Sequence, residues 1–449
     1  MLPLAVILKG MGHKVSGSDR SHDQGRTPEK FRWIEAQGIT LYPQDGSGIS
    51  PDLDEVVISK AVEDTVPDIA AAKAQGTRII TRVEMLVRLF NGGGRRIAIA
   101  GTSGKTTTTG MTGYILKEAG LDPTVMNGGI FRNYMEQNPY ATAFVGRGGI
   151  FVSEVDESDG ADAVATYRPD IAVLHNITLD HQPMSELVPM FAGFLSHAGR
   201  VILNADEDAV MKAAGDCART ALTYSMKGRR ADISASEIVM HPDGVSARVR
   251  HDGAVHDLRL GIPGRHNLSN ALAALAAAHE AGVAMKDAVK ILSGFSGIRR
   301  RLEVVGAANG VTVIDDFAHN PDKIAATLSA LHEFPGRLHI FFQPHGYGFL
   351  KVVGRELAGS FAAHMRAGDR LYMVEPFYAG GTVDRSVGSA DIVADIVTRG
   401  AQAVLVQDRQ AALEAVTAGA AKGDRVVVMG ARDDTLSAFA AQILEKIAV

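Results

Sequence analysis

The chain has 449 residues, which at roughly 100–200 residues per domain predicts two to four domains, and its 46% hydrophobic and 22% charged residues are ordinary for a globular protein. A net charge of −5 excludes a general attraction to nucleic acid, and the single cysteine, Cys217, excludes an internal disulfide framework and fits a reducing cytoplasm. No segment reaches the roughly 18 apolar residues that a membrane span needs, so we expect a cytoplasmic protein without such a span.

Short apolar, β-branched runs alternate with Ala-rich helical stretches along most of the chain. The runs expected to be strands include 55–59, 96–100, 149–153, 170–174, 200–203 and 425–429. Because helices that connect parallel strands cover the faces of the sheet, this alternation predicts an α/β fold with parallel sheets. A β-rich stretch at about 231–260 contains the turn sequence His241-Pro242-Asp243-Gly244 and predicts a small insertion.

Two glycine-rich breaks divide the chain. The first, 91–94, precedes a strong strand pattern, and the second, 294–297, follows a long helical region before a strand pattern resumes. We therefore expect three domains, at 1–92, 93–297 and 298–449.

A phosphate-binding loop follows the strand expected at 96–100. It reads Gly101-Thr102-Ser103-Gly104-Lys105-Thr106-Thr107, and a helix is expected to begin within it. Glycines let backbone N–H groups converge on phosphate oxygens, and a helix N-terminus adds partial positive charge. Lys105 can reach the terminal phosphates, and the Thr106 hydroxyl can ligate Mg²⁺. Ile99 stands where the longer form of this motif has glycine, so the loop is the short G-T-x-G-K-T form, and it predicts ATP and Mg²⁺ as cofactors.

Further motifs occur in a fixed order after this loop. They are S-E-V-D-E-S-D-G at 153–160, N-I-T-L-D-H at 176–181, N-A-D-E-D at 204–208, P-G-R-H-N-L-S-N at 263–270 and I-D-D-F-A-H-N-P at 314–321. With the G-T-x-G-K-T loop, this set resembles the Mur ligase family, most closely its muramate–alanine branch, with features of the muropeptide ligases. The resemblance runs from about residue 10 to the end of the chain.

The resemblance implies a fold and an activity. The fold would be α/β in three domains: a Rossmann-like N-terminal UDP-substrate domain, a central P-loop ATPase-type parallel sheet with a small β-rich insertion, and a C-terminal Rossmann-like amino-substrate domain. The activity would be an ATP-dependent amide-bond ligase of peptidoglycan precursor synthesis, which joins L-alanine to UDP-N-acetylmuramate through an acyl-phosphate and releases ADP and phosphate. The partners would be a UDP-sugar carboxylate and an amino acid or short peptide.

The resemblance also implies residue roles. The ATP site would comprise Gly101, Thr102, Ser103, Gly104, Lys105, Thr106, Thr107, Asn176, Asn267, Asn270 and Arg301. The metal ligands would be Thr106, Glu154 and His181. The catalytic set would be Lys105, Glu154, His181, Arg301 and Asp316. Substrate-binding candidates are Asp19, Ser59, His319 and His345.

The implied chemistry explains why these residue types are needed. Forming an acyl-phosphate brings an anionic carboxylate against an anionic phosphate, so cations must offset the repulsion. Lys105, Arg301 and Mg²⁺ are the natural cations, and Glu154 offers the hard oxygen ligand that Mg²⁺ prefers.

Two departures from the family pattern leave alternatives open. The chain opens in the helix that should follow a first strand and glycine-rich turn, so we expect either a start upstream or a missing first strand. Gly346 and Phe349 replace arginines of the muramate–alanine branch, which leaves the amino substrate open. The alternatives are a muropeptide-recycling ligase that attaches a tripeptide, a polyglutamate-type or cyanophycin-type ligase, and a nucleotide-binding module without catalysis.

Overall fold

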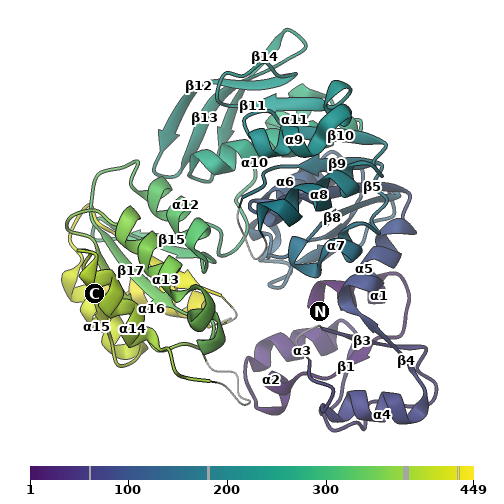
Figure 1. The fold of residues 1–449 in the computed structure, drawn as a ribbon, viewed down its shortest axis with the longest axis horizontal. Coiled ribbons are helices and arrows are strands. Elements are labelled where there is room, and N and C mark those ends of the chain that lie inside the picture. The colour runs from purple at the N-terminus through teal and green to yellow at the C-terminus, as the bar shows by residue number, and fades with distance from the viewer. Residues whose placement is uncertain (60–61, 179–182, 378–383, 432, 434) are drawn as a thin grey trace. The chain divides into compact units, whose positions relative to one another are not determined.

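The computed structural model describes residues 1–59, 62–178, 183–377, 384–431, 433 and 435–449 (Figure 1). These residues form two compact units. The first unit comprises 1–236, 249–256 and 270–295, and the second comprises 237–248, 257–269 and 296–449. Among the described residues, no helix is both long and apolar enough to cross a membrane.

The N-terminal part of the first unit holds short strands among helices. Its helices are α1 (Leu2–Gly10), α2 (Arg20–Asp23), α3 (Pro28–Ala36), α4 (Pro67–Gln75) and α5 (Arg82–Asn91). Its strands are β1 (Ser16–Gly17), β2 (Thr40–Leu41), β3 (Glu55–Ile58) and β4 (Arg78–Thr81). In the described residues these strands form two separate parallel pairs, β1 with β2 and β3 with β4, rather than one continuous sheet.

Helix α5 connects this region to the large central sheet, and its start is fixed locally. The Thr81 hydroxyl accepts a hydrogen bond from the Glu84 backbone at 3.2 Å, and the Glu84 carboxylate accepts one from the Thr81 backbone at 2.6 Å. This reciprocal capping satisfies two backbone donors that a helix start otherwise leaves unpaired. The cap therefore fixes the first turn of α5, which also carries Arg82.

The central sheet has ten strands among the described residues, in the order β14-β13-β12-β11-β10-β9-β5-β8-β6-β7. The strands are β5 (Arg95–Ala100), β6 (Thr124–Met126), β7 (Ala143–Phe144), β8 (Ile150–Glu154), β9 (Ile171–Leu174), β10 (Arg200–Asn204), β11 (Leu222–Ser225), β12 (Ile233–His241), β13 (Gly244–His251) and β14 (Ala254–Leu260). Strands β5, β8, β9, β10 and β11 pair in parallel, as the sequence predicts, and β7 pairs antiparallel with β6. The turn expected at 241–244 connects β12 to β13.

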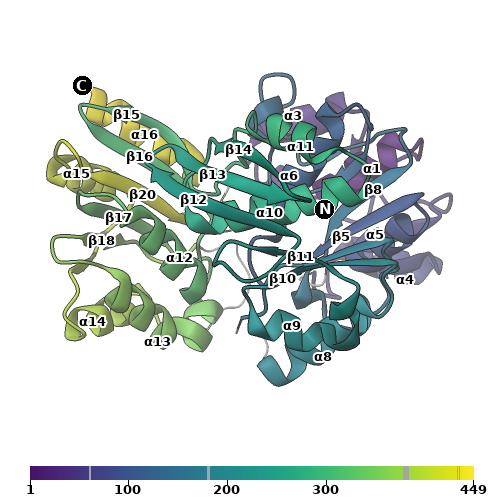
Figure 2. The same ribbon diagram turned by 90° about the horizontal axis from the view of Figure 1, so that it is seen from above.

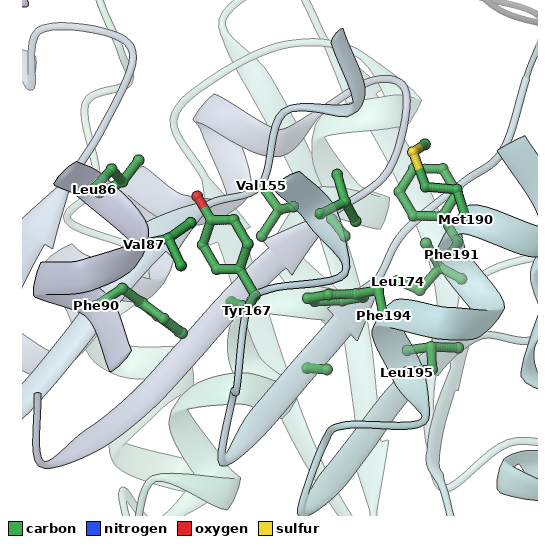
Figure 3. Packing of buried hydrophobic residues seen from close by; sticks show 14 of the residues in the cluster. Leu86, Val87, Phe90, Val155, Tyr167, Leu174, Met190, Phe191, Phe194 and Leu195 are labelled. Carbon is green, nitrogen blue, oxygen red and sulfur yellow. The ribbon is translucent and has the colours of Figure 1, made fainter. Parts of the chain in front are cut away.

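Helices cover the central sheet. They are α6 (Lys105–Glu118), α7 (Ala161–Val164), α8 (Met184–Leu195), α9 (Asp208–Ala214), α10 (Arg265–Glu280) and α11 (Met285–Leu292), with 3-10 turns η1 (Arg132–Tyr134), η2 (Glu157–Asp159) and η3 (Gly215–Arg219). Figure 3 shows the packed core on one face, with Phe90 of α5 beside Tyr167 at one end and Phe191 and Phe194 of α8 at the other. The rings of Phe90 and Tyr167 lie 5.3 Å apart. Burial of such large rings is a main source of stability.

The second unit contains a six-stranded sheet in the order β15-β16-β20-β17-β18-β19. Its strands are β15 (Glu303–Ala308), β16 (Val311–Asp316), β17 (Leu338–Gln343), β18 (Arg370–Met373), β19 (Ala403–Leu405) and β20 (Arg425–Gly430). Its helices are α12 (Pro321–Leu331), α13 (Tyr347–His364), α14 (Ser389–Thr398), α15 (Arg409–Gly419) and α16 (Leu436–Ala448). Helices α12, α13 and α14 cover one face and α15 and α16 the other (Figure 2). Strand β15 is antiparallel to β16, and the other described pairs are parallel.

Candidate nucleotide site

The loop between β5 and α6 has the conformation that a phosphate cradle needs. Gly101 and Gly104 have φ values of 138° and 81°, which residues with a Cβ atom rarely adopt. A Cβ at Gly101 would lie 3.1 Å from the backbone of Asn176, and a Cβ at Gly104 would collide with the side chain of Asn270. The glycines therefore let the loop turn tightly into α6 against Asn176 and Asn270, and the start of a helix carries the partial positive charge that suits an anion.

Lys105, the first residue of α6, is mostly buried and fully engaged. Its ammonium donates to the Gly101 carbonyl at 2.8 Å and lies 2.5 Å from a carboxylate oxygen of Glu157. Burial by itself lowers the pKa of Lys105, but neighbouring carboxylates, above all that of Glu157, raise it by more. The net effect raises the pKa, and the group stays cationic at neutral pH.

Thr106 and Glu154 come together from different elements. Thr106 lies in the first turn of α6 and Glu154 ends β8, and the Thr106 hydroxyl donates to the Glu154 carboxylate at 2.8 Å. Gly128 passes directly over this pair, and a Cβ there would collide with Glu154 and lie 3.3 Å from the Thr106 hydroxyl. A hydroxyl and a carboxylate in contact with each other are hard oxygen donors that suit Mg²⁺.

Asn176 follows β9 and braces the loop. Its side-chain carbonyl accepts from the Ser103 backbone at 2.8 Å and from the Thr102 hydroxyl at 3.0 Å, while its amide donates to the Ser103 carbonyl at 2.9 Å. The Thr102 hydroxyl also contacts Thr178. These contacts hold the loop in shape, so the geometry gives Asn176 a positioning role for the loop.

The other predicted nucleotide contacts lie in α10. Asn270 is buried, and its side-chain oxygen accepts from the Thr108 hydroxyl of α6 at 3.3 Å, which brings it against the loop. Asn267 is also buried, and its amide donates to the Pro263 carbonyl at 2.7 Å. Thr107 is buried in the first turn of α6. His181, expected as a metal ligand, lies outside the described residues.

In the second unit, the adjacent residues Arg300 and Arg301 have different surroundings. The buried Arg300 donates to the Asp315 carboxylate at 3.1 Å and to the Gly430 carbonyl at 2.8 Å. The half-buried Arg301 lies with its guanidinium 4.9 Å from the ring centre of Phe317. Arg300 therefore holds the fold together, and Arg301 is the more accessible cation.

Asp316 ends β16 and organises the turn beside Arg301. Its carboxylate accepts from the backbone N–H groups of Leu302 at 2.6 Å and Ala318 at 2.7 Å. Burial raises the pKa of Asp316, although these hydrogen bonds and Arg301 oppose that shift. The geometry makes Asp316 a brace of the backbone.

The four predicted substrate-binding residues lie in two regions. His319 and His345, which follow β16 and β17, have ring centres 5.2 Å apart, and burial lowers the pKa of His319 to about 3. Asp19 caps α2, where it accepts from the Ser21 backbone at 2.8 Å, and Ser59 follows β3. The structure therefore pairs the two histidines, and it gives Asp19 a structural partner.

Sequence reasoning gave no role to Glu157, Gly128 or Asp159. Glu157 contacts the loop lysine, Gly128 crosses the Thr106–Glu154 pair, and Asp159 accepts from Arg82 of α5 at 3.0 Å. The acidic run at 153–160 contains the signal for Glu157 and Asp159, but only the tertiary contacts distinguish its carboxylates from one another.

Known proteins similar to this chain cover nearly all of it. Residues 1–93, 99–278 and 300–432 match family models described as Mur ligase family, catalytic domain; Mur ligase middle domain; and Mur ligase, glutamate ligase domain. A UDP-N-acetylmuramate–L-alanine ligase from Lachnospira eligens is 33% identical over 96% of this chain and 93% of the relative. One from Rhodopseudomonas palustris is 35% identical over 98% of this chain and 94% of the relative.

Solved structures agree with the expected fold. The UDP-N-acetylmuramate–alanine ligase of Thermotoga maritima is similar with a TM-score of 0.78 and 22% identity, over 99% of this chain and 96% of that one. A murein peptide ligase from Psychrobacter arcticus has a TM-score of 0.73 and 25% identity, over 100% of this chain and 96% of that one. These likenesses confirm the α/β fold class, and the chain belongs to the Mur ligase family.

Proposed function

We propose that this Mur ligase joins L-alanine to the carboxylate of UDP-N-acetylmuramate, with ATP converted to ADP and phosphate. The observation that carries the proposal is the identity of 33–35% with ligases of that name over 96–98% of the chain. We also propose that domains at 1–92, 93–297 and 298–449 serve the UDP-sugar, ATP and the amino substrate, respectively. Because ATP and UDP-linked sugars are cytoplasmic metabolites, we propose the cytoplasm as its location.

The loop and its neighbours fit ATP and Mg²⁺. The two loop glycines have positive φ and let Asn176 and Asn270 pack directly against the loop, and the Thr106 hydroxyl and Glu154 carboxylate offer adjacent oxygen donors. In this proposal residues 101–107 hold the phosphates, while Thr106 and Glu154, joined by His181, hold the metal. Bound Mg²⁺ would supply positive charge where the carboxylate and the terminal phosphate meet.

The chain's own residues would perform two tasks in this reaction. Lys105 supplies a fixed positive charge at the terminal phosphates, and Arg301 supplies a second one from the C-terminal domain. Asp316 fixes the backbone next to Arg301, because its carboxylate binds the N–H of Leu302.

A second candidate function is the attachment of a tripeptide to the same UDP-sugar. It is favoured by the 25% identity and full-length likeness to a murein peptide ligase, and by Phe349, whose ring lies 4.1 Å from that of His345. Phe349 stands where the muramate–alanine branch has an arginine, and an apolar ring cannot form an ion pair with the carboxylate of a single amino acid. The two candidates differ in the amine and share the acyl-phosphate step.

The test is an ADP-release assay with UDP-N-acetylmuramate, ATP and Mg²⁺. L-Alanine and the tripeptide Ala-Glu-diaminopimelate are offered separately, and Lys105→Ala is the inactive control. Release that depends on alanine supports the first candidate, and release that depends on the tripeptide supports the second. Nucleotide binding without release for any amine would contradict both and would favour a non-catalytic module.

A further inference from the structure

Lys105 and Glu157 form a buried ion pair, in which Glu157 has no role assigned so far. The Glu157 side chain is 3% exposed and that of Lys105 is 13% exposed, and their charged atoms lie 2.5 Å apart. The Lys105 ammonium also contacts the carbonyls of Gly101 at 2.8 Å and Thr102 at 3.5 Å. Protein acceptors therefore contact the ammonium on several sides, and a phosphate that reaches it competes with them.

The turn that carries Glu157 is rigidly held. The Asp156 carboxylate accepts from the Ser158 backbone at 3.0 Å and from its hydroxyl at 2.8 Å. Three residues after Asp156, the Asp159 carboxylate accepts from Arg82 at 3.0 Å. Because residues on both sides of Glu157 have their own partners, the turn holds Glu157 beside Lys105.

The surroundings of Lys105 are acidic. Besides Glu157, the carboxylates of Asp156 and Glu154 interact with the same ammonium. An anion without a metal would meet these carboxylates, and it would have to draw Lys105 away from a buried partner. A buried carboxylate that loses its cation is strongly disfavoured. A cation that arrives with the phosphates would offset that loss beside Glu154.

We propose that Glu157 is a selectivity residue, which makes the loop accept metal-bound polyphosphates and reject metal-free ones. Glu157 neutralises Lys105 until an incoming metal ion supplies replacement charge. The inference rests on the proposed nucleotide site and goes beyond it, because it assigns Glu157 and ties binding to the metal. It predicts a property of binding that is measurable without catalysis.

The test is equilibrium binding of ATP by calorimetry, with excess Mg²⁺ and with a chelator, to the full-length wild type and Glu157→Gln. The glutamine keeps the shape and removes the charge. We expect Glu157→Gln to bind metal-free ATP about tenfold more tightly than the wild type, while affinity for Mg²⁺-ATP changes severalfold at most. The preference for the metal complex should thus fall about tenfold.

Asp162→Asn is the matched control, because Asp162 is an exposed acid just beyond the same acidic turn. It should leave the metal preference unchanged. An unchanged preference in Glu157→Gln, or an equal loss in the control, overturns the proposal.

Two further results keep the test decisive. If Glu157→Gln does not fold, Glu157→Asp is measured instead. Its shorter side chain places the carboxylate farther from Lys105, so the preference for the metal complex should fall by less than tenfold. An unchanged preference overturns the proposal. If the wild type binds no nucleotide in either condition, the proposed function itself fails, which is a result distinct from failure of the selectivity proposal.

Discussion

The phosphate loop of the first unit and the arginine–aspartate turn of the second unit use similar charged residues in opposite ways. In the loop, Lys105 and Thr106 contact Glu157 and Glu154, which come from another strand and its following turn. In the second unit, Arg300 and Asp316 bind mainly backbone groups and a buried aspartate of the same turn region. Charged side chains at the loop therefore contact side chains from a separate segment beside the proposed nucleotide site, whereas most of those at the turn contact backbone groups and stabilise the fold.

The largest effect is expected at the loop. Lys105→Ala should reduce turnover by about 3–5 kcal/mol of transition-state stabilisation, because no other described residue of the loop carries a positive charge to the phosphates. Steady-state ADP release measures it. Lys117→Ala, which removes the same charge from the far end of α6, is the control and should keep near-normal turnover. Retained activity in Lys105→Ala would refute the assignment.

The arginine pair tests the comparison within the second unit. Arg300→Ala should lower the free energy of unfolding by about 3–5 kcal/mol, because it leaves the carboxylate of Asp315 buried without its cation. Arg301→Ala should change stability by about 0.5 kcal/mol or less and should instead reduce turnover. Urea unfolding and ADP release, measured on both variants, separate the two roles. The reverse assignment would follow if Arg301→Ala unfolded the protein and Arg300→Ala did not.

A smaller effect is expected from the brace of the loop. Asn176→Ala removes three hydrogen bonds to Thr102 and Ser103, so the loop should lose its fixed shape. We expect the KM for ATP to rise roughly 5- to 30-fold, which corresponds to a loss of about 1–2 kcal/mol in binding free energy, with a smaller change in kcat. Kinetics at varied ATP concentration measure this split. A fall in kcat at constant KM would instead point to a direct catalytic contact.

The smallest effect concerns acid stability. Burial lowers the pKa of His319 to about 3, below its ordinary value of 6.5, so the unfolded chain binds a proton more readily than the folded one. Stability should therefore fall by about 1 kcal/mol as pH decreases from 6.5 to 5.5, because of this group. Urea unfolding of wild type and His319→Gln across this range measures it. An equal pH slope in both proteins would show that His319 does not contribute.

Local patterns in the sequence were enough to predict the strand–turn–helix segment of the loop and the α/β fold class. The order of strand, glycine-rich turn and helix at 96–107 is local, because glycine conformations and helix starts depend on neighbouring residues. The alternation of apolar runs and helical stretches likewise predicted parallel sheets, because the hydrophobic period and the length of each connection can be read from the sequence. The expected β-rich insertion with its turn at 241–244 is present for the same reason.

The different surroundings of similar charged residues became visible only in the folded chain. Arg300 and Arg301 are neighbours of the same type, and packing buried one against Asp315 and left the other half-buried. Glu154 and Glu157 look alike in one acidic run, yet one contacts Thr106 and the other Lys105. Such roles depend on distances between segments far apart in the sequence, and electrostatic interactions are set by those distances and by burial, which no local pattern records.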